Sequence, residues 1–340
     1  MPTIRPRVFG AAFEVRAFEA RDGPGVLELL QATFGHWPRD IQGIAPSEFF
    51  RWKHMDGPFG PSKLLVAEAD DAVIGFLAYM PWRFSASGQV LPTMRGVDLA
   101  VHRSYRRLGV SMAIRAEAKP PSSVAFIWST TNEQSHPGQL KSGRSDVRNL
   151  PRFVRPCGRL RDTSRRVCAR ESKAAEHLHV EADTAGEILR DGEHASQLLA
   201  QTVKPSAHLA TSKDLDYLRW RYAQFEGYRA ITVDASASAS GMVIFRPRRH
   251  GRFWVSHVCE LFVEGNDPRT TRRLLRQVRE ASPADFISCN FSSRHRAARY
   301  GFVQHRSRTV LTVYPLQQNP IPDPTQRTSW ALSLGDLELL

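Results

Sequence analysis

The fold is decided by residues 97–111, which read VDLAVHRSYRRLGVS. Leu99 and Val101 alternate with small or polar residues, the pattern of a half-buried strand. No helix breaker occurs in residues 112–119, so a helix is expected to begin near Gly109 and to run to about residue 118. The stretch therefore predicts a strand, a short basic turn and a helix.

A turn of this kind is suited to holding a diphosphate. The first N–H groups of a helix have no intrahelical acceptor, and the positive end of the helix dipole lies behind them. Gly109 allows backbone to approach a ligand closely, the small Ser111 does not block it, and Arg106 and Arg107 add positive charge. The alternative is an ordinary surface turn with solvated arginines, which the flanking strand and helix make the weaker interpretation.

The same residues carry a family resemblance. The string Arg106-Arg107-Leu108-Gly109-Val110-Ser111 resembles the acyl-CoA loop of the GNAT N-acetyltransferases, Gln/Arg-x-x-Gly-x-Gly/Ala, with serine in the last small position. The resemblance implies that this loop binds acetyl-CoA as a co-substrate. It also implies coenzyme contacts from Leu99, Ala100 and Val101, with the Val101 backbone pairing with pantetheine. Asn132 matches a family position that contacts the coenzyme, and it is equally suited to cap a helix.

The resemblance also implies direct acyl transfer to an amine. An alkylammonium must lose a proton before it attacks a thioester, so a general base is needed. Asp98 occupies the strand position where many GNAT enzymes keep a glutamate base; alternatively, it is a strand carboxylate paired with a neighbouring arginine. Gln139 stands where many members have an acidic tyrosine, and glutamine supplies no proton. The thiolate then leaves with help from Tyr105, Ser135 or His136, or it is protonated by solvent.

Composition sets further limits. A chain of 340 residues is long for one domain and suggests two. No apolar run approaches the roughly 20 residues that cross a bilayer, and no secretory signal is visible, so we expect a cytoplasmic protein. Four cysteines without metal-ligand spacing favour free thiols and no metal site. The formal net charge of +13 fits a polyanionic coenzyme or simply many solvated arginines, and no nucleic-acid-binding motif accompanies it.

The chain order predicts an α/β fold with mixed, mostly antiparallel sheets, and a repeat. Strands are expected over residues 13–18, 63–69, 73–83, 97–101, 124–129 and 147–155, and helices over 24–34, 47–54 and 110–118. The motif EFFRWK at residues 48–53 has a faint copy, DYLRWR, at 216–221, and residues 257–263 correspond to the strand of Asp98. An internal repeat of this length implies two domains of one fold. We expect an acetyl-CoA-binding domain over 1–157, a basic linker over 158–185 and a degenerate GNAT-like domain with a C-terminal tail over 186–340.

The second copy lacks the phosphate loop. In its place stands Glu264-Gly265-Asn266-Asp267-Pro268-Arg269, whose carboxylates repel a diphosphate. The sequence thus predicts an acetyl-CoA-dependent N-acetyltransferase for a small amine such as an amino sugar, amino acid or antibiotic-like amine. Two alternatives stay open: an aminoacyl-tRNA-dependent transferase of the FemAB kind, and a non-catalytic acyl-CoA-binding protein. The sequence leaves open whether the chain is a monomer or a homodimer.

Overall fold

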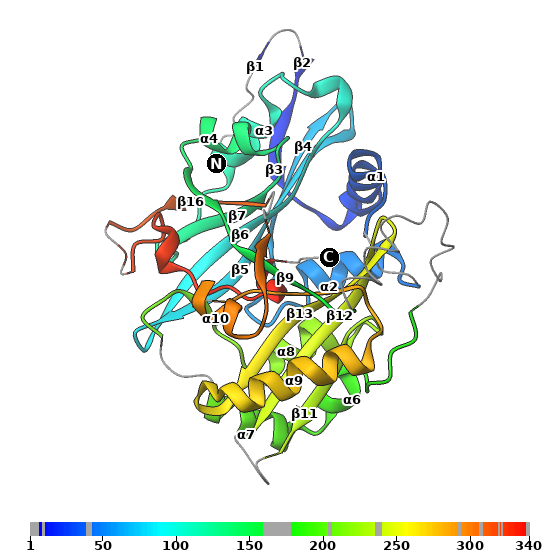
Figure 1. Cartoon of the computed structure of the whole chain (residues 1–340). Coiled ribbons are helices and arrows are strands. Elements are labelled where there is room, and N and C mark those ends of the chain that lie inside the picture. The colour runs from blue at the N-terminus through cyan, green and yellow to red at the C-terminus, as the bar shows by residue number, and fades with distance from the viewer. Residues whose placement is uncertain are drawn as a thin grey trace. The chain divides into compact units, whose positions relative to one another are not determined.

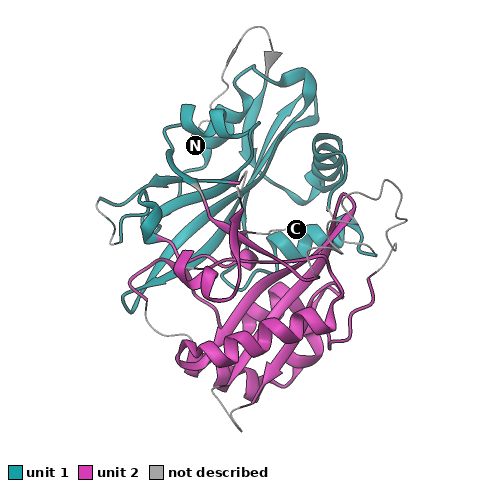
Figure 2. Ribbon diagram, viewed as in Figure 1, with its two compact units in different colours: residues 1–148, 310–329, 340 teal, residues 149–309, 330–339 magenta. Residues whose placement is uncertain are grey.

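The protein is described from a computed structural model. It describes residues 7–8, 11–38, 43–158, 178–202, 206–234, 240–291, 294–305, 309–318, 320 and 322–337. The chain divides into two compact units (Figure 2). Unit 1 comprises residues 1–148, 310–329 and 340, and unit 2 comprises residues 149–309 and 330–339.

Unit 1 is built on one mixed sheet with the strand order β3-β4-β5-β6-β7-β16-β8 (Figure 1). The strands are β3 (Glu14–Ala17), β4 (Lys63–Ala69), β5 (Ala72–Ala86), β6 (Gln89–Val101), β7 (Phe126–Thr131), β16 (Val310–Pro315) and β8 (Ser145–Asn149). Pairing is antiparallel from β3 to β6 and between β7 and β16, whereas β6 and β7 run parallel. A short pair, β1 (Arg7–Val8) and β2 (Ala11–Ala12), lies outside this sheet.

Helices complete unit 1. They are α1 (Gly23–Phe34), α2 (Pro46–His54), α3 (Val110–Glu117) and α4 (His136–Lys141), with short 3₁₀ turns η1 (Ala20–Asp22), η2 (Arg103–Tyr105) and η5 (Arg327–Ser329). The apolar side of α3, Val110 and Ile114, packs into a core cluster with Leu65, Leu77 and Met94 of the sheet. This packing fixes the start of α3 against the end of β6. The predicted strand, turn and helix are confirmed here.

Unit 2 repeats this sheet order. Its sheet runs β11-β12-β13-β14-β9-β15, antiparallel except for the parallel pair β13 and β14. The strands are β11 (Arg229–Val233), β12 (Gly241–His250), β13 (Phe253–Val263), β14 (Phe286–Cys289), β9 (Arg152–Pro156) and β15 (Val303–His305). The predicted fold class, two mixed α/β sheets flanked by helices, is confirmed.

Helices also flank the sheet of unit 2. They are α6 (Ala185–Arg190), α7 (Gly192–Thr202), α8 (Leu215–Leu218), the π-helix η3 (Arg219–Ala223), the 3₁₀ turn η4 (Glu264–Asn266), α9 (Pro268–Ala281), α10 (Arg294–Arg299) and α11 (Leu334–Leu337), with the short strand β10 (Ala210–Thr211). Figure 1 shows α9 lying across β11–β13. Leu274, Leu275 and Val278 of α9 enter the core of this unit.

The unit boundaries differ from the contiguous division expected at residues 157 and 186. The segment predicted as one closing strand over 147–155 forms two strands, of which β8 joins the first sheet and β9 the second. β16 then returns to unit 1, between β7 and β8. The two sheets thus exchange strands, because β9 fills in unit 2 the position that β16 fills in unit 1.

Part of the expected linker is structured. Val180 and Ala182 pack against the core cluster of unit 2, and the Glu181 N–H donates to the Ala281 carbonyl at 2.9 Å. Residues 159–177 of that expected linker lie outside the described residues. In the expected C-terminal tail, Leu334–Leu337 form the short helix α11 of unit 2.

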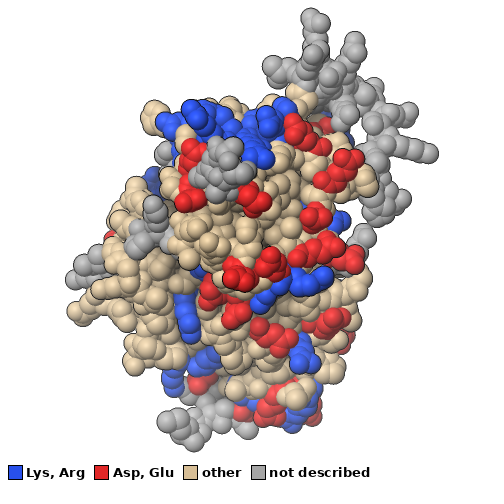
Figure 3. All heavy atoms as spheres, turned by 90° about the horizontal axis from the view of Figure 1, so that it is seen from below, with Lys and Arg blue, Asp and Glu red and all other residues tan. Residues whose placement is uncertain are grey.

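The surface charge is mixed. Figure 3 shows acidic and basic side chains interspersed over the face seen from below, with basic side chains gathered along one margin. Helix α9 alone exposes five arginines: Arg269, Arg272, Arg273, Arg276 and Arg279. None of the helices in the described part of the chain combines the length and apolar character needed to cross a bilayer.

Candidate functional site

The basic turn of unit 1 presents main-chain amides. Gly109 is the N-cap of α3 with φ 82°, and Arg107 also lies in the left-handed region with φ 66°. The first N–H groups bonded within α3 are those of Met112 and Ala113, which both donate to the Gly109 carbonyl at 3.0 Å. The N–H groups of the residues just before them therefore face outward at the positive end of the helix. This geometry fits a diphosphate.

The residues expected to bind the coenzyme occupy this turn and the strand end before it. Leu99, Ala100 and Val101 are the last residues of β6, and Val110 and Ser111 form the first turn of α3. The side chains of Arg106 and Arg107 are exposed, and Leu108 is half-buried. Arg106 Nε donates to the Val101 carbonyl at 3.2 Å, so the turn is tied back to the strand.

The corresponding helix start in unit 2 is chemically different. Asp267 is the N-cap of α9, and its side chain accepts a hydrogen bond from the Thr270 N–H at 2.7 Å. This bond holds the pKa of Asp267 below its usual value. A carboxylate of the chain itself thus satisfies the amide that an anion would use, as the acidic replacement in the sequence suggests.

Next to the turn, β6 and β7 separate. Their parallel register covers Met94 with Ile127 and Arg95 with Trp128. Within the described residues, the two strands share no further register, although β6 continues to Val101. The separated strand ends form a split in the sheet whose closed end lies at Arg95 and whose open end lies beside the basic turn.

Asp98 lies on the split part of β6, in an irregular stretch. The β5–β6 register shifts between Phe76 and Ala78, and Asp98 takes φ 52°. A left-handed conformation is uncommon for residues other than glycine, asparagine and aspartate. The shifted register accompanies the contact of Asp98 with helix α2.

Two residues of α2 bind this carboxylate. Lys53 Nζ lies 2.8 Å from Asp98 Oδ2, and His54 Nε2 lies 3.1 Å from the same oxygen. The side chain of Lys53 is 3% exposed and that of His54 is fully buried. His54 Nδ1 in turn lies 3.2 Å from Ser62 Oγ. Asp98 is therefore an ion-paired strand carboxylate, but its partners are a lysine and a histidine, not the arginine considered in the sequence.

The contacts among Asp98, Lys53 and His54, together with burial, set the pKa values of Asp98 and His54. Burial alone would raise the pKa of Asp98, but the charge of Lys53 and the hydrogen bond with His54 outweigh it and hold the pKa far below its usual range. Burial lowers the pKa of His54 despite Asp98. The arrangement at neutral pH is a carboxylate, an ammonium and a neutral imidazole. A carboxylate with so low a pKa is a weak proton acceptor, which favours a positioning role for Asp98.

The contacts described for the other expected site residues do not include Asp98, Lys53 or His54. His136 begins α4, and its Nε2 lies 3.4 Å from Asp146. Tyr105, in η2, packs beside the His102 ring and against the core cluster of unit 1. Asn132 follows β7, and its Oδ1 accepts from the Ser135 N–H at 2.9 Å in the turn before α4, whose N-cap is Ser135 rather than Asn132. Gln139 is 7% exposed, with no hydrogen-bond partner for Oε1 among the described residues.

Sequence reasoning does not identify Lys53 or His54. The available signal is the position of both at the end of an aromatic helix, after Phe49, Phe50 and Trp52, where polar side chains become buried. Long-range pairing with Asp98 leaves no local pattern. The two ends of the pair lie 45 residues apart.

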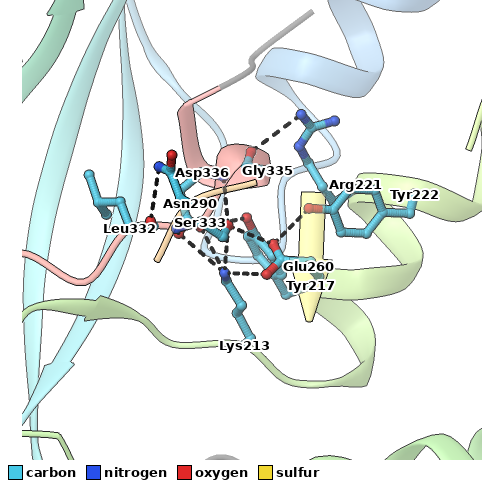
Figure 4. A network of polar contacts seen from close by, with 10 residues as sticks. All are labelled: Lys213, Tyr217, Arg221, Tyr222, Glu260, Asn290, Leu332, Ser333, Gly335 and Asp336. Carbon is cyan, nitrogen blue, oxygen red and sulfur yellow. Dashed lines mark hydrogen bonds and ion pairs between the residues drawn. The ribbon is translucent and has the colours of Figure 1, made fainter. Parts of the chain in front are cut away.

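Unit 2 contains a buried network at the corresponding place (Figure 4). In the repeat, Tyr222 corresponds to His54 and Glu260 to Asp98, and the Tyr222 hydroxyl donates to Glu260 Oε1 at 2.7 Å. Lys213 Nζ joins Glu260 at 2.7 Å to Asp336 of α11 at 3.1 Å. Burial opposes the charge of Lys213, but the two carboxylates raise its pKa. The network therefore links the C-terminal segment to β13.

Comparisons with known proteins identify a related domain family and related folds. Residues 14–118 match the family model of the acetyltransferase (GNAT) domain. Among solved structures, a "probable N-acyltransferase" of Enterococcus faecalis aligns with a TM-score of 0.62 at 12% identity, covering 89% of this chain and 73% of its own. A GCN5-related N-acetyltransferase of Anabaena variabilis aligns with a TM-score of 0.59 at 12% identity, over 90% and 73% of the chains.

A third structure has a more distant likeness. The Saccharomyces cerevisiae N-myristoyltransferase aligns with a TM-score of 0.50 at 12% identity, over 92% of this chain and 81% of its own. No curated protein matches the sequence significantly. At these identities, the structural neighbours establish the fold, and the family model establishes the domain. Residues 14–118 therefore match a GNAT acetyltransferase domain, and the chain as a whole has the fold of its structural neighbours.

Proposed function

We propose that the chain is an acyl-CoA-dependent N-acyltransferase that transfers its acyl group directly to the amine of a small molecule. The acceptor classes that we propose are those that the sequence suggests: an amino sugar, an amino acid or an antibiotic-like amine. The observation that carries the proposal is the outward-facing amide cluster at Gly109, where β6 ends and α3 begins. A diphosphate bound there has main-chain N–H donors, a helix dipole and two exposed arginines.

The split between β6 and β7 supports the same proposal. An acyl-CoA arm that starts at the turn has unpaired strand edges beside it, to which an amide-containing chain can hydrogen-bond. Asp98 lies on this part of β6, where it holds the charge of Lys53 and the ring of His54 in place. The amine proton passes to solvent or to a group outside this ion pair, because Asp98 is already neutralised by Lys53.

Calorimetry with acetyl-CoA tests the binding step. Gly109→Glu places a carboxylate and a Cβ at a left-handed residue that faces the diphosphate, so we expect acetyl-CoA binding to be abolished. Gly88→Glu is the matched control, because Gly88 has a similar φ of 79° in a distant hairpin. Heat of binding that survives in Gly109→Glu contradicts the assignment of the loop.

A non-catalytic acyl-CoA-binding protein is the second candidate. It is favoured by the neutralised Asp98 and by Gln139, which supplies no proton at the position of the family tyrosine. Release of free thiol from acetyl-CoA across a panel of amines separates the two candidates. Thiol release that depends on one amine supports the enzyme, and acetyl-CoA binding without turnover on any amine supports the binding protein.

A further inference from the structure

An arginine side chain lies at the closed end of the split in unit 1. Arg144 follows α4 in the chain, and its side chain reaches Gly96 of β6. A Cβ added to Gly96 would lie 3.7 Å from Arg144 Nη2. Arg144 Nη1 lies 3.4 Å from Ser129 Oγ of β7. Gly96 and Ser129 are the residues directly after the last paired positions of the two strands. Arg144 therefore marks the point where the split begins.

This guanidinium is buried, and the described part of the chain gives it no acidic partner. Arg144 is 7% exposed, and the Tyr79 hydroxyl is hydrogen-bonded to it. Arg115 of α3 lies close enough to repel it, and burial together with that repulsion lowers the pKa of Arg115. Among the residues that the structure describes, no carboxylate pairs with Arg144 or Arg115.

An arrangement of this kind is costly unless an anion completes it. Burial of an unpaired charge is unfavourable, and a second cation nearby adds to the cost. Among the described residues of unit 1, two other cations are buried: Lys53 of α2 has its carboxylate at 2.8 Å, and Arg95 of β6 lies over the rings of Trp82 and Trp128. The chain thus neutralises Lys53 itself, whereas Arg144, between two strands, has hydroxyl partners and no carboxylate among the described residues, which suits it to an anion that arrives from outside.

The position of Arg144 indicates which group that is. If acyl-CoA is held by its diphosphate at the turn, its arm runs along β6 from Val101 towards Gly96, about 17 Å at strand rise. The reacting end of the coenzyme and the acceptor then lie towards the closed end. Tyr79 and Ser129, both 2% exposed, provide hydroxyl groups beside the guanidinium. A planar guanidinium with neighbouring hydroxyls matches a carboxylate.

We propose that Arg144, with Tyr79 and Ser129, binds a carboxylate carried by one of the two substrates at the closed end of the split. The inference rests on the proposed function and names its substrate class. The carboxylate belongs either to the acyl group, as in a dicarboxylic acid monothioester, or to the acceptor, as in an amino acid. A long, wholly apolar acyl chain does not fit beside this charge.

The acyl source is tested by calorimetry with succinyl-CoA and butyryl-CoA. The two thioesters have four-carbon acyl groups and differ in the terminal carboxylate. The acceptor source is tested by thiol release from acetyl-CoA with phenylalanine and with phenethylamine, which lacks the carboxylate. We expect a preference of roughly tenfold to a hundredfold for the carboxylate in one of the two arms, the usual value of a hydrogen-bonded charge.

Arg144→Met is expected to abolish that preference, and Arg144→Lys to retain part of it. Arg51→Met is the control, because the Arg51 side chain is 77% exposed and lies 3.6 Å from Asp56. If Arg144→Met does not fold, the wild type alone decides, since the absence of a preference in both arms overturns the inference. A preference that persists in folded Arg144→Met also overturns it. If neither thioester binds, the proposed function fails and the inference with it, whereas binding without a carboxylate preference refutes the inference alone.

Discussion

Asp98 connects the irregular part of β6 to the end of α2. Its negative charge balances the ammonium of Lys53, which has little access to water. Lys53 is 3% exposed and has Asp98 as its carboxylate at 2.8 Å. Asp98→Asn fits the left-handed conformation but leaves the ammonium without a counter-charge. We expect the free energy of unfolding to fall by about 3–5 kcal/mol, as for other broken buried pairs. Urea denaturation measures this loss.

The double variant Lys53→Met/Asp98→Asn serves as the control. It removes both charges from the same place, so we expect it to recover much of the stability lost in Asp98→Asn. Acetyl-CoA binding should remain in both variants where they are folded, because the amide cluster at Gly109 does not involve either side chain. A single variant as stable as the wild type would show that Lys53 does not depend on Asp98.

His54 gives the protein a specific dependence on pH. Burial lowers its pKa below the ordinary value, so the unfolded chain binds a proton at a higher pH than the folded chain does. Below pH about 6.5, the unfolded state then holds more protons, and the free energy of unfolding falls as the pH falls. The loss is expected to reach about 1.4 kcal/mol per pH unit.

The measurement is the free energy of unfolding at several pH values between 7 and 5. His54→Gln, which cannot titrate, is expected to reduce the slope by up to one proton. His194→Gln is the control because the His194 side chain is 44% exposed. Equal slopes in the wild type and His54→Gln would mean that His54 titrates alike in both states.

Among the elements, α3 is held at one defined height above the sheet. Gly75 of β5 allows this, since a Cβ there would lie 2.8 Å from both Val110 Cγ1 and Ile114 Cδ1. Gly75→Ala forces the first turns of α3 away from the strand, and overpacking of this kind costs about 1–3 kcal/mol. We expect a lower free energy of unfolding together with weaker acetyl-CoA binding, measured by denaturation and calorimetry.

Gly138→Ala is the control for Gly75→Ala. Gly138 lies within α4, and a Cβ there meets nothing within 4 Å. Alanine is the better helix former, so this variant is expected to be neutral or slightly stabilising. If Gly75→Ala changed neither property, the height of α3 would not be set by this glycine.

Local patterns were sufficient for the elements that carry their own signal. Period-two alternation located β3 and the end of β6, and apolar spacing with a breaker located α1 and α3. The strand–turn–helix around Gly109 was predictable because its geometry is produced by neighbouring residues. The ion pair of Lys53 with Asp98 was not, because no sequence rule links a helix end to a strand 45 residues later.

The strand exchange shows the same limit for the whole molecule. A strand pattern indicates which face is buried but not which sheet the strand joins. Residues 147–155 thus resembled one closing strand, whereas β8 and β9 enter different sheets. The repeat in sequence still predicted two sheets of one kind, because the motif at residues 48–53 and the strand of Asp98 each have a copy in the second half.

The exchange makes a prediction about the contiguous fragment of residues 1–157. This fragment contains β7 and β8 but lacks β16, which pairs with β7 from Val310 to Pro315 and lies between the two strands. Without it, the buried strand β7 has an open edge, and such edges pair with other chains. We expect fragment 1–157 to aggregate or to lack a cooperative thermal transition, as measured by circular dichroism.

Addition of a peptide of residues 309–329 isolates the cause. The peptide supplies Leu311 and Val313, which are fully buried in the sheet, and completes the hydrogen bonds along β7. A cooperative transition should therefore return with the peptide but not with a variant that carries Val313→Asp, because a buried charge at that place has no partner. A fragment that melts cooperatively without any peptide would show that β16 is an accessory strand and that unit 1 is stable from residues 1–157 alone.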